Sequence, residues 1–321
     1  MLASSALGAH AQKLTPENQV IYLRHIVEQA TGQADKDAAL RLIGQAGTYQ
    51  GLVFAATMLG DQPSAPAAAE AVMATLAAHP EYNGTEARQF AVRAMSHLKG
   101  AAKRQARAWL DAASKDEEGF VCLFNGRDLE GWKGLVENPI ARAKMTAEEL
   151  KAAQEKADET ARRDWIVENG CLVYIGSGWD NLCTASDDYQ DFELLVDWCL
   201  DPNGTEPDAG VYLRGTPQVQ IWDIRRTNVG AQVGSGGLYN NQKNPSTPTS
   251  VEDNKLGEWN TFRIIMKGEQ VTVYLNGMLV VDNVTLENYW DRSLPIFPTG
   301  QIEMQAHGSR CYFRNIYVRK L

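Results

Sequence analysis

Cysteine, positive charge and long apolar runs are all scarce in this sequence. Its five cysteines form no CxxC pair and no Cys/His spacing typical of zinc, which argues against a zinc site or a disulfide scaffold. Lys and Arg total 31 against 40 Asp and Glu, and this net charge of -9 argues against nucleic acid or an anionic membrane as the main partner. No run reaches the roughly 20 apolar residues that a membrane-spanning helix needs. A neutral, polar ligand fits this composition better.

The chain is long and apolar enough to fold without such supports. It has 321 residues, 44% of them hydrophobic, which excludes a disordered chain and suggests about two domains. Residues 1–11 are small and apolar and end in Ala9-His10-Ala11, like the tail of a secretory signal without its charged beginning. We therefore expect residues 1–14 to be a signal remnant or a disordered native N-terminus, and the protein to be exported, to the periplasm.

Residues 15–115 predict a helical domain. Thr15 followed by Pro16 is an N-cap with proline at the first helical position, and Val20, Leu23 and Val27 recur at helical spacing. Similar stretches of comparable length predict a small antiparallel bundle or a fragment of an α-solenoid. They cover residues 35–46, 48–59, 64–78, 86–98 and 101–114. An interaction role for this domain is compatible with any activity elsewhere, and the sequence names no protein partner for it.

Residues 119–321 predict an antiparallel β-sandwich. Short alternating strands recur without helices between them, and Asn276-Gly277 between two apolar runs is a strong hairpin signal. One amphipathic helix, over residues 146–163, interrupts the strands and begins with a capping box of Thr146 and Glu149. The expected fold is α+β and multidomain, a small helical bundle followed by a jelly-roll sandwich.

Three strand segments combine a core face with an unusual polar face. In residues 208–214, 218–223 and 301–307, apolar side chains alternate with amide, carboxylate, guanidinium, imidazole and aromatic groups. Stacked side by side, these outer rows would give a floor of hydrogen-bonding groups with aromatic stacking surfaces, which is how proteins bind sugars. We expect the 301–307 row to be exposed and all three rows to share one cleft. The alternative is that these polar rows are simply the solvent-facing side of an amphipathic sheet, with no ligand.

A family resemblance adds to this pattern. Residues 119–132, GFVCLFNGRDLEGW, resemble the opening signature of the 3-keto-disaccharide hydrolase family, formerly a domain of unknown function. Further segments resemble its successive motifs in order: residues 208–214, 218–223, 237–239, 257–263, 275–277 and 305–316. The resemblance covers residues 119–321 and implies a concanavalin-like or laminarinase-like jelly roll active on glucosides oxidised at C3. Many members of that family carry a carboxylate where this chain has Gln218, so no base or metal-ligand role follows for that position.

The chemistry of a 3-keto-glucoside suggests roles for the polar rows. The ketone acidifies the C2 proton, so a base can remove it, the enolate can expel the glycosidic oxygen from C1, and water can add to the enone. His307 and Glu303 suit the base and acid roles, and Asp208 is a third candidate. The predicted substrate-binding residues are Arg214, Gln218, Gln220, Trp222, Tyr239 and Gln305. Glu303 and His307 could instead hold a divalent metal, but two ligands from one strand are too few to assign a cofactor.

Two other functions compete with this hypothesis. A retaining endoglucanase on this type of sandwich would carry a carboxylate run such as Glu-x-Asp-x-x-Glu, and the sequence has none. A non-catalytic carbohydrate-binding module remains open, because an amide and aromatic face binds sugars equally well without chemistry.

Overall fold

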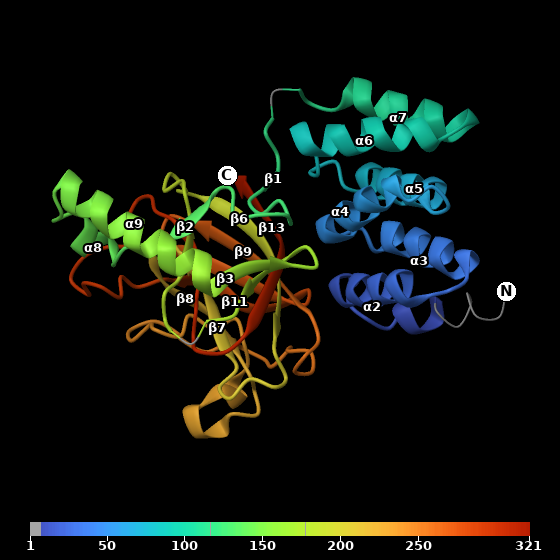
Figure 1. The fold of residues 1–321 in the computed structure, drawn as a ribbon. Coiled ribbons are helices and arrows are strands. Elements are labelled where there is room, and N and C mark those ends of the chain that lie inside the picture. The colour runs from blue at the N-terminus through green and yellow to red at the C-terminus, as the bar shows by residue number, and fades with distance from the viewer. Residues whose placement is uncertain (1–7, 116, 177) are drawn as a thin grey trace. The chain divides into compact units, whose positions relative to one another are not determined.

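The computed structural model describes residues 8–115, 117–176 and 178–321. The chain divides into two compact units, Met1–Val121 and Cys122–Leu321, the first mainly helical and the second mainly β (Figure 1). This confirms the expected α+β fold, with N-terminal helices followed by an antiparallel sandwich. Most of the expected signal remnant, residues 1–7, lies outside the described residues, while residues 8–11 are helical. Among the described helices, none is both long and apolar enough to cross a membrane.

In the first unit, helices follow one another in a row of packed neighbours (Figure 1). They are α2 (Pro16–Gln29), α3 (Gln33–Ala46), α4 (Tyr49–Thr57), α5 (Ala65–Ala78), α6 (Thr85–His97) and α7 (Gly100–Ala112). The Thr15 hydroxyl accepts the Asn18 amide at 3.4 Å, which caps α2 as predicted. Gly44 lets α3 approach α5 closely, because a Cβ there would lie 2.6 Å from the Cα of Ala71.

In the second unit, the strands form two antiparallel sheets. The strands are β1 (Val121–Cys122), β2 (Trp132–Gly134), β3 (Trp165–Glu168), β4 (Cys171–Tyr174), β5 (Leu182–Thr184), β6 (Phe192–Leu200), β7 (Asp208–Leu213), β8 (Thr216–Trp222), β9 (Asn260–Lys267), β10 (Gln270–Leu275), β11 (Met278–Thr285), β12 (Ile302–Met304) and β13 (Cys311–Lys320). The larger sheet has the order β11-β10-β9-β6-β13-β4-β3, with β1 beside β13. The smaller sheet has the order β2-β5-β12-β7-β8.

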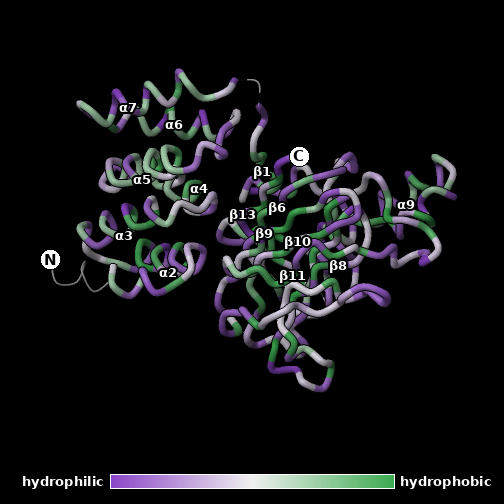
Figure 2. The backbone as a smooth tube through the Cα atoms, turned by 180° about the vertical axis from the view of Figure 1, so that it is seen from behind, coloured by the Kyte–Doolittle hydropathy of each residue, from purple (hydrophilic) through white to green (hydrophobic). Residues whose placement is uncertain are grey.

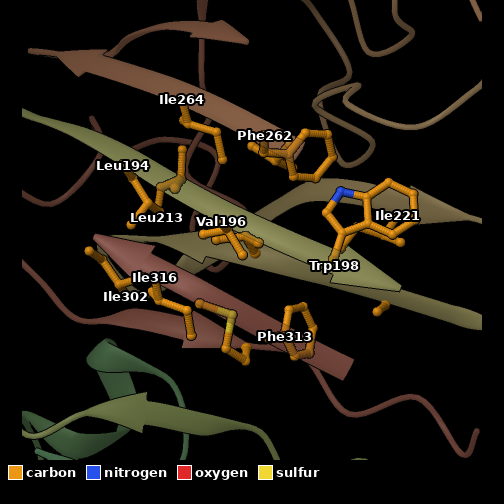
Figure 3. Close-up of a cluster of buried hydrophobic side chains, with 14 of the residues drawn as sticks. Leu194, Val196, Trp198, Leu213, Ile221, Phe262, Ile264, Ile302, Phe313 and Ile316 are labelled. Atoms are coloured by element: carbon orange, nitrogen blue, oxygen red, sulfur yellow. The ribbon is translucent and has the colours of Figure 1, made fainter. Parts of the chain in front are cut away.

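The two sheets enclose one apolar core. Along β6, Leu194, Val196 and Trp198 point inward, and Leu213 and Ile221 enter the same cluster from β7 and β8 (Figure 3). The hydrophobic stretches of backbone accordingly run along the strands in the middle of the sandwich (Figure 2). Successive side chains of a strand point to opposite faces of the sheet. Because every second residue of β7 and β8 faces the core, the residues between them face outward.

The predicted β-hairpin forms between β10 and β11. Asn276 and Gly277 have φ values of 51° and 83°, and Leu275 pairs directly with Met278. Both turn residues therefore adopt the left-handed conformation that a two-residue hairpin turn requires.

The inserted helix α9 (Ala147–Asp164) follows the short helix α8 (Pro139–Arg142) and packs against β2 and β3, the edge strands of the two sheets. Thr146 and Glu149 form the predicted capping box. The Gln154 side chain donates to the Gly134 carbonyl at 2.8 Å, and Asp158 accepts the Gly134 amide at 3.0 Å. These hydrogen bonds let helix α9 cover the free edge of β2. Without this cover, the edge could pair with a strand of another chain.

Candidate active site

The outer face of the smaller sheet brings the three predicted polar segments together. The register of β7 and β8 pairs Asp208 with Trp222 and Gly210 with Gln220. The Gln305 amide donates to the Gly210 carbonyl at 2.9 Å, just beyond the end of β12. The period-two pattern therefore identified side chains that are neighbours in space.

These side chains line a cavity of about 480 Å³. This volume lies in the range of small-molecule sites. Seven of the predicted residues line it, namely Asp208, Gln218, Gln220, Trp222, Tyr239, Gln305 and His307, and further walls come from Glu206, Tyr212, Pro217, Arg226, Val229, Asn240, Tyr289 and Trp290. We call it the His307 cavity.

A second cavity of about 360 Å³ adjoins the first and contains Glu303. The two cavities share Tyr212, Trp290 and Gln305 as walls. The predicted residues Glu303 and His307 therefore line neighbouring cavities rather than one cleft.

Asp208 is a buried carboxyl group at the floor of the His307 cavity. Burial raises its pKa to about 7, outweighing both the hydrogen bond from Gln220 Nε2 at 2.7 Å and the charge of Arg226, whose Nη1 lies 3.5 Å from Oδ2. This carboxyl group can consequently change its charge near neutral pH.

A chain of amides orients Asp208. Gln218 Nε2 donates to Gln220 Oε1, and Gln220 Nε2 donates to Asp208 Oδ1. Asn240 Nδ2 approaches Gln218 Oε1 at 3.5 Å from the facing loop. Gln218 thus takes a hydrogen-bonding position in the site.

His307 stands beside Asp208, with 3.8 Å between its Nδ1 and Asp208 Oδ2. The ring of Trp179 meets the imidazole edge to face at a centroid distance of 4.1 Å. Burial lowers the pKa of His307, and the positive charge of Arg226 lowers it further. The imidazole is therefore neutral at neutral pH and able to accept a proton.

Glu303 differs from the expected exposed carboxylate because it is only 1% exposed. The only side chain that hydrogen-bonds it among the described residues is Asn181, whose Nδ2 lies 3.3 Å from Oε2. Burial raises the pKa of Glu303 to about 7, against the opposing effects of this hydrogen bond and of the Arg142 charge. Gln301 and Gln305 are buried as well, and Gln301 Nε2 donates to the Thr184 carbonyl of the neighbouring strand β5 at 3.2 Å.

Several buried polar atoms around the His307 cavity have no hydrogen-bond partner within the described residues. They are Nδ1 of His307, Oε1 of Gln305 and Nη1 of Arg226. Buried polar atoms are nearly always hydrogen-bonded, so unsatisfied ones call for an explanation. Three of the ten such atoms among the described residues belong to the lining of this one cavity, where a polar ligand or water would complete their hydrogen bonds.

Arg214 does not lie at either cavity, which corrects the expected site. Strand β7 ends at Leu213, and Arg214 has a φ of 53°, so the alternation stops one residue before it. Its guanidinium is buried and donates to Asp191 Oδ1 at 2.9 Å and to the Phe297 carbonyl at 3.3 Å. Arg226 supplies the guanidinium in the His307 cavity instead.

The residues that sequence patterns missed lie in loops. Arg226 follows β8 by a turn, Trp179 and Asn181 precede β5, and Tyr289 and Trp290 follow β11. Loops carry no periodicity that predicts which way a side chain points, so only the aromatic and basic character of these residues hinted at a role.

The described residues contain no group of three or more His, Cys, Asp or Glu side chains arranged to hold a metal ion. Glu303 and His307, the predicted alternative ligands, are not brought together with a third such side chain.

Solved structures of similar chains include two from Parabacteroides distasonis ATCC 8503, provisionally named as glycosyl hydrolases. One is 22% identical over 63% of this chain and 94% of its own, with a TM-score of 0.46, and the other is 23% identical over 59% and 99%, with 0.40. The carbohydrate-binding module CBM66 from Bacillus subtilis is 10% identical over 59% of this chain and 96% of its own, with a TM-score of 0.35. At these values the likenesses say nothing of activity. No curated protein matches the chain.

The sequence of the second unit gives a firmer assignment. Residues 119–319 match the family model of the 3-keto-alpha-glucoside-1,2-lyase-like domain, which is more than half of the 321 residues. The chain therefore belongs to this glycoside-active family, in agreement with the resemblance found in its motifs.

Proposed function

We propose that this protein cleaves glycosides already oxidised at C3, by removing the C2 proton. The observation that carries the proposal is the His307 cavity, where a neutral imidazole, a buried carboxyl group and unsatisfied polar atoms meet. The family assignment supports a glycoside as the ligand. Cleavage that starts with removal of the C2 proton does not require the two carboxylates that conventional glycosidases place on either side of the anomeric carbon.

His307 is the base in this proposal. Its neutral imidazole takes the C2 proton, and the electron pair of that bond forms the enolate of the C3 ketone. The Asp208 carboxyl, 3.8 Å away, stabilises the imidazolium when ionised. Nη1 of Arg226 lies 3.5 Å from Asp208 Oδ2 but makes no hydrogen bond within the described residues, so it supplies a donor for the enolate oxygen.

Glu303 is the acid that completes the elimination. The enolate expels the glycosidic oxygen from C1, and this oxygen takes a proton as it leaves. With its pKa raised to about 7 by burial, Glu303 still holds a proton near neutral pH. Water then adds at C1 of the enone and a proton returns to C2, so the overall reaction is hydrolysis.

The decisive experiment follows the C2 hydrogen. A 3-keto-glucoside cleaved in heavy water should give a sugar with deuterium at C2, while the unoxidised parent should be inert because its C2 proton is far less acidic. His307→Ala should lower kcat by about two to four orders of magnitude. His79→Ala, a histidine of the helical unit paired with Glu81, is the matched control and should leave kcat unchanged.

The outcomes separate the alternatives. Cleavage of unoxidised glucosides at similar rates without deuterium at C2 would mean direct displacement at C1. Parallel assays with and without a chelator test the divalent metal that Glu303 and His307 were considered to hold.

A carbohydrate-binding module remains the second candidate because exposed aromatic rings border the His307 cavity. Tyr239 is 50% exposed and Tyr289 42% exposed, and such rings are typical platforms for sugars. Binding of 3-keto-glucosides with no turnover would favour this function over catalysis.

A further inference from the structure

A third cavity, of about 400 Å³, opens at one end of the sandwich. Its walls come from the ends of β6 and β8, the start of β9, and the loop at residues 253–258. Only Trp222 lines both this cavity and the His307 cavity. We call it the Trp198 cavity.

The first unusual feature of this cavity is the indole of Trp198. Trp198 is 3% exposed, and its Nε1 has no hydrogen-bond partner among the residues that the structure describes. Other buried indoles of this unit do have one: Trp132 donates to the Leu123 carbonyl at 2.6 Å and Trp165 to the Asp180 carbonyl at 3.2 Å. Buried tryptophans usually satisfy this donor, and Trp198 lacks the partner that Trp132 and Trp165 have.

The second feature is a buried acceptor on Asp253, another residue that lines this cavity. Oδ2 of Asp253 accepts the Ser235 amide at 3.0 Å, but the buried Oδ1 has no partner within the described part of the chain. The loop that carries Asp253 is fixed in place, because Asn254 donates from its backbone to Asn260 Oδ1 at 2.8 Å and from its side chain to the Trp259 carbonyl at 2.9 Å. The site is therefore preformed rather than created by loop closure.

The chemistry of these groups narrows the class of ligand. An ammonium ion could bond Asp253 but offers no acceptor to the Trp198 N–H, and an anion could accept that N–H but would meet the Asp253 carboxylate. A hydroxyl group does both, since it accepts one hydrogen bond and donates another. The indole of Trp222 and the side chain of Leu200 add apolar surface that suits the C–H face of a sugar ring.

The charged residues at this cavity do not change the expected ligand, a neutral molecule that carries hydroxyl groups. Arg225 lines the cavity but is engaged with Asp223, at 2.9 Å from Nε and 3.0 Å from Nη2. The exposed Lys255 and Glu258 carry opposite charges. Three acidic and two basic residues line the cavity, so the lining carries a single net negative charge, which a neutral ligand tolerates better than an anion does.

We propose that the Trp198 cavity is a second binding site, for an unoxidised sugar ring. It is separate from the site of C2 proton removal, since none of the His307, Gln305 and Asp208 side chains lines it. The inference does not rest on the proposed reaction, because the groups that define it take no part in that reaction.

The test uses the indole N–H resonances of the full chain, labelled with ¹⁵N. Methyl α-D-glucopyranoside, which has no ketone, is titrated in. The Trp198 resonance, assigned through Trp198→Phe, should shift and saturate. Trp179 and Trp290, which line the cavity next to His307, report on the other site. His307→Ala should leave the Trp198 shift intact.

Asp253→Asn provides the matched variant, because an asparagine keeps one oxygen for the Ser235 amide and loses the other acceptor. The affinity measured through Trp198 should fall about tenfold, as for loss of a hydrogen bond to a charged group. Cleavage of 3-keto-glucosides should be unchanged. A Trp198 resonance that never moves while Trp179 and Trp290 respond would overturn the proposal and leave a hydrated cavity. An unchanged affinity in folded Asp253→Asn would overturn it equally.

Discussion

Replacing Glu303 with glutamine should stabilise the protein in mildly alkaline solution and have little effect in mildly acidic solution. Glutamine has nearly the same shape as glutamate and keeps an oxygen to accept the Asn181 side chain, which lies 3.3 Å from Oε2. It removes only the capacity to carry a charge. Among the described residues the cation that acts on Glu303 is Arg142, whose guanidinium donates to the Val136 and Glu137 carbonyls, so the variant leaves no buried cation without hydrogen bonds.

The magnitude follows from the raised pKa of Glu303. In the unfolded chain this carboxyl titrates near 4.5, and in the folded protein near 7. Between these values the folded state binds the proton more tightly, so stability is greatest below about pH 4.5, falls as the pH rises through this window, and is constant above it. One pKa unit corresponds to about 1.4 kcal/mol, so the whole shift is worth about 3 kcal/mol. About 2.5 kcal/mol of this should be lost between about pH 5 and pH 8.

The assay is thermal unfolding of both proteins at about pH 5 and pH 8. For a unit of this size about 2.5 kcal/mol corresponds to a change in the Tm difference between variant and parent of about 5 to 10 °C from the lower to the higher pH, with the variant more stable at the higher pH. Asp208 and Glu86, whose pKa values burial also raises to about 7, titrate in both proteins and cancel in the comparison. A Tm difference that does not change with pH would refute the reasoning.

Glu193→Gln is the matched control for this prediction. Glu193 is also buried, but its carboxylate pairs with Arg263 at 2.6 Å and with Arg319. Its neutralisation removes the carboxylate charge that pairs with both guanidinium groups, so this variant should be destabilised at both pH values. Stabilisation of Glu193→Gln at about pH 8 would mean that the ion pairs do not offset burial as assumed.

Further predictions concern the sheet under the site and the inserted helix. Gly210→Ala places a Cβ 2.8 Å from Gln305 Oε1, the movable end of a side chain, so it should weaken sugar binding by about tenfold or more while lowering stability by under about 1 kcal/mol. Gly134→Ala places a Cβ 2.1 Å from the Ala157 carbonyl oxygen, a backbone atom, and should mainly lower Tm. Equal effects on binding and on Tm in both variants would contradict this distinction. Thr146→Ala removes the capping box and should cost about 1 kcal/mol. Hydrogen exchange should rise in the first turn of α9, and unchanged protection there would show that the cap is dispensable.

The sequence predicted the cavity floor well because the floor is made of strands. Gln218, Gln220 and Trp222 alternate with core residues over an unbroken strand, so a period of two suffices to assign their face. The same rule failed at Arg214, because it was extended one residue past the end of β7 into a left-handed turn. Alternation predicts direction only while the backbone stays extended.

The burial of the polar rows could not be predicted from the sequence. Whether an outward residue meets water depends on loops packed over it, such as those that bring Asn181 and Trp290 to Glu303. Loop side chains follow no period, and their positions result from tertiary contacts. The sequence therefore supplied the chemical groups, and the fold supplied the low exposure that changes their pKa values.

The cost of this arrangement argues that it serves a ligand. A buried carboxyl group at 303 and the unsatisfied atoms of His307, Gln305 and Arg226 all reduce the stability of the sandwich. Glutamine at 303 would keep the Asn181 contact without a charge, and apolar residues elsewhere would leave nothing unsatisfied. Natural proteins tolerate such costs chiefly at functional sites, where the missing partners arrive with the bound molecule. Because three of these atoms line one cavity of a domain from a glycoside-active family, we propose that the oxygens of a sugar complete their hydrogen bonds.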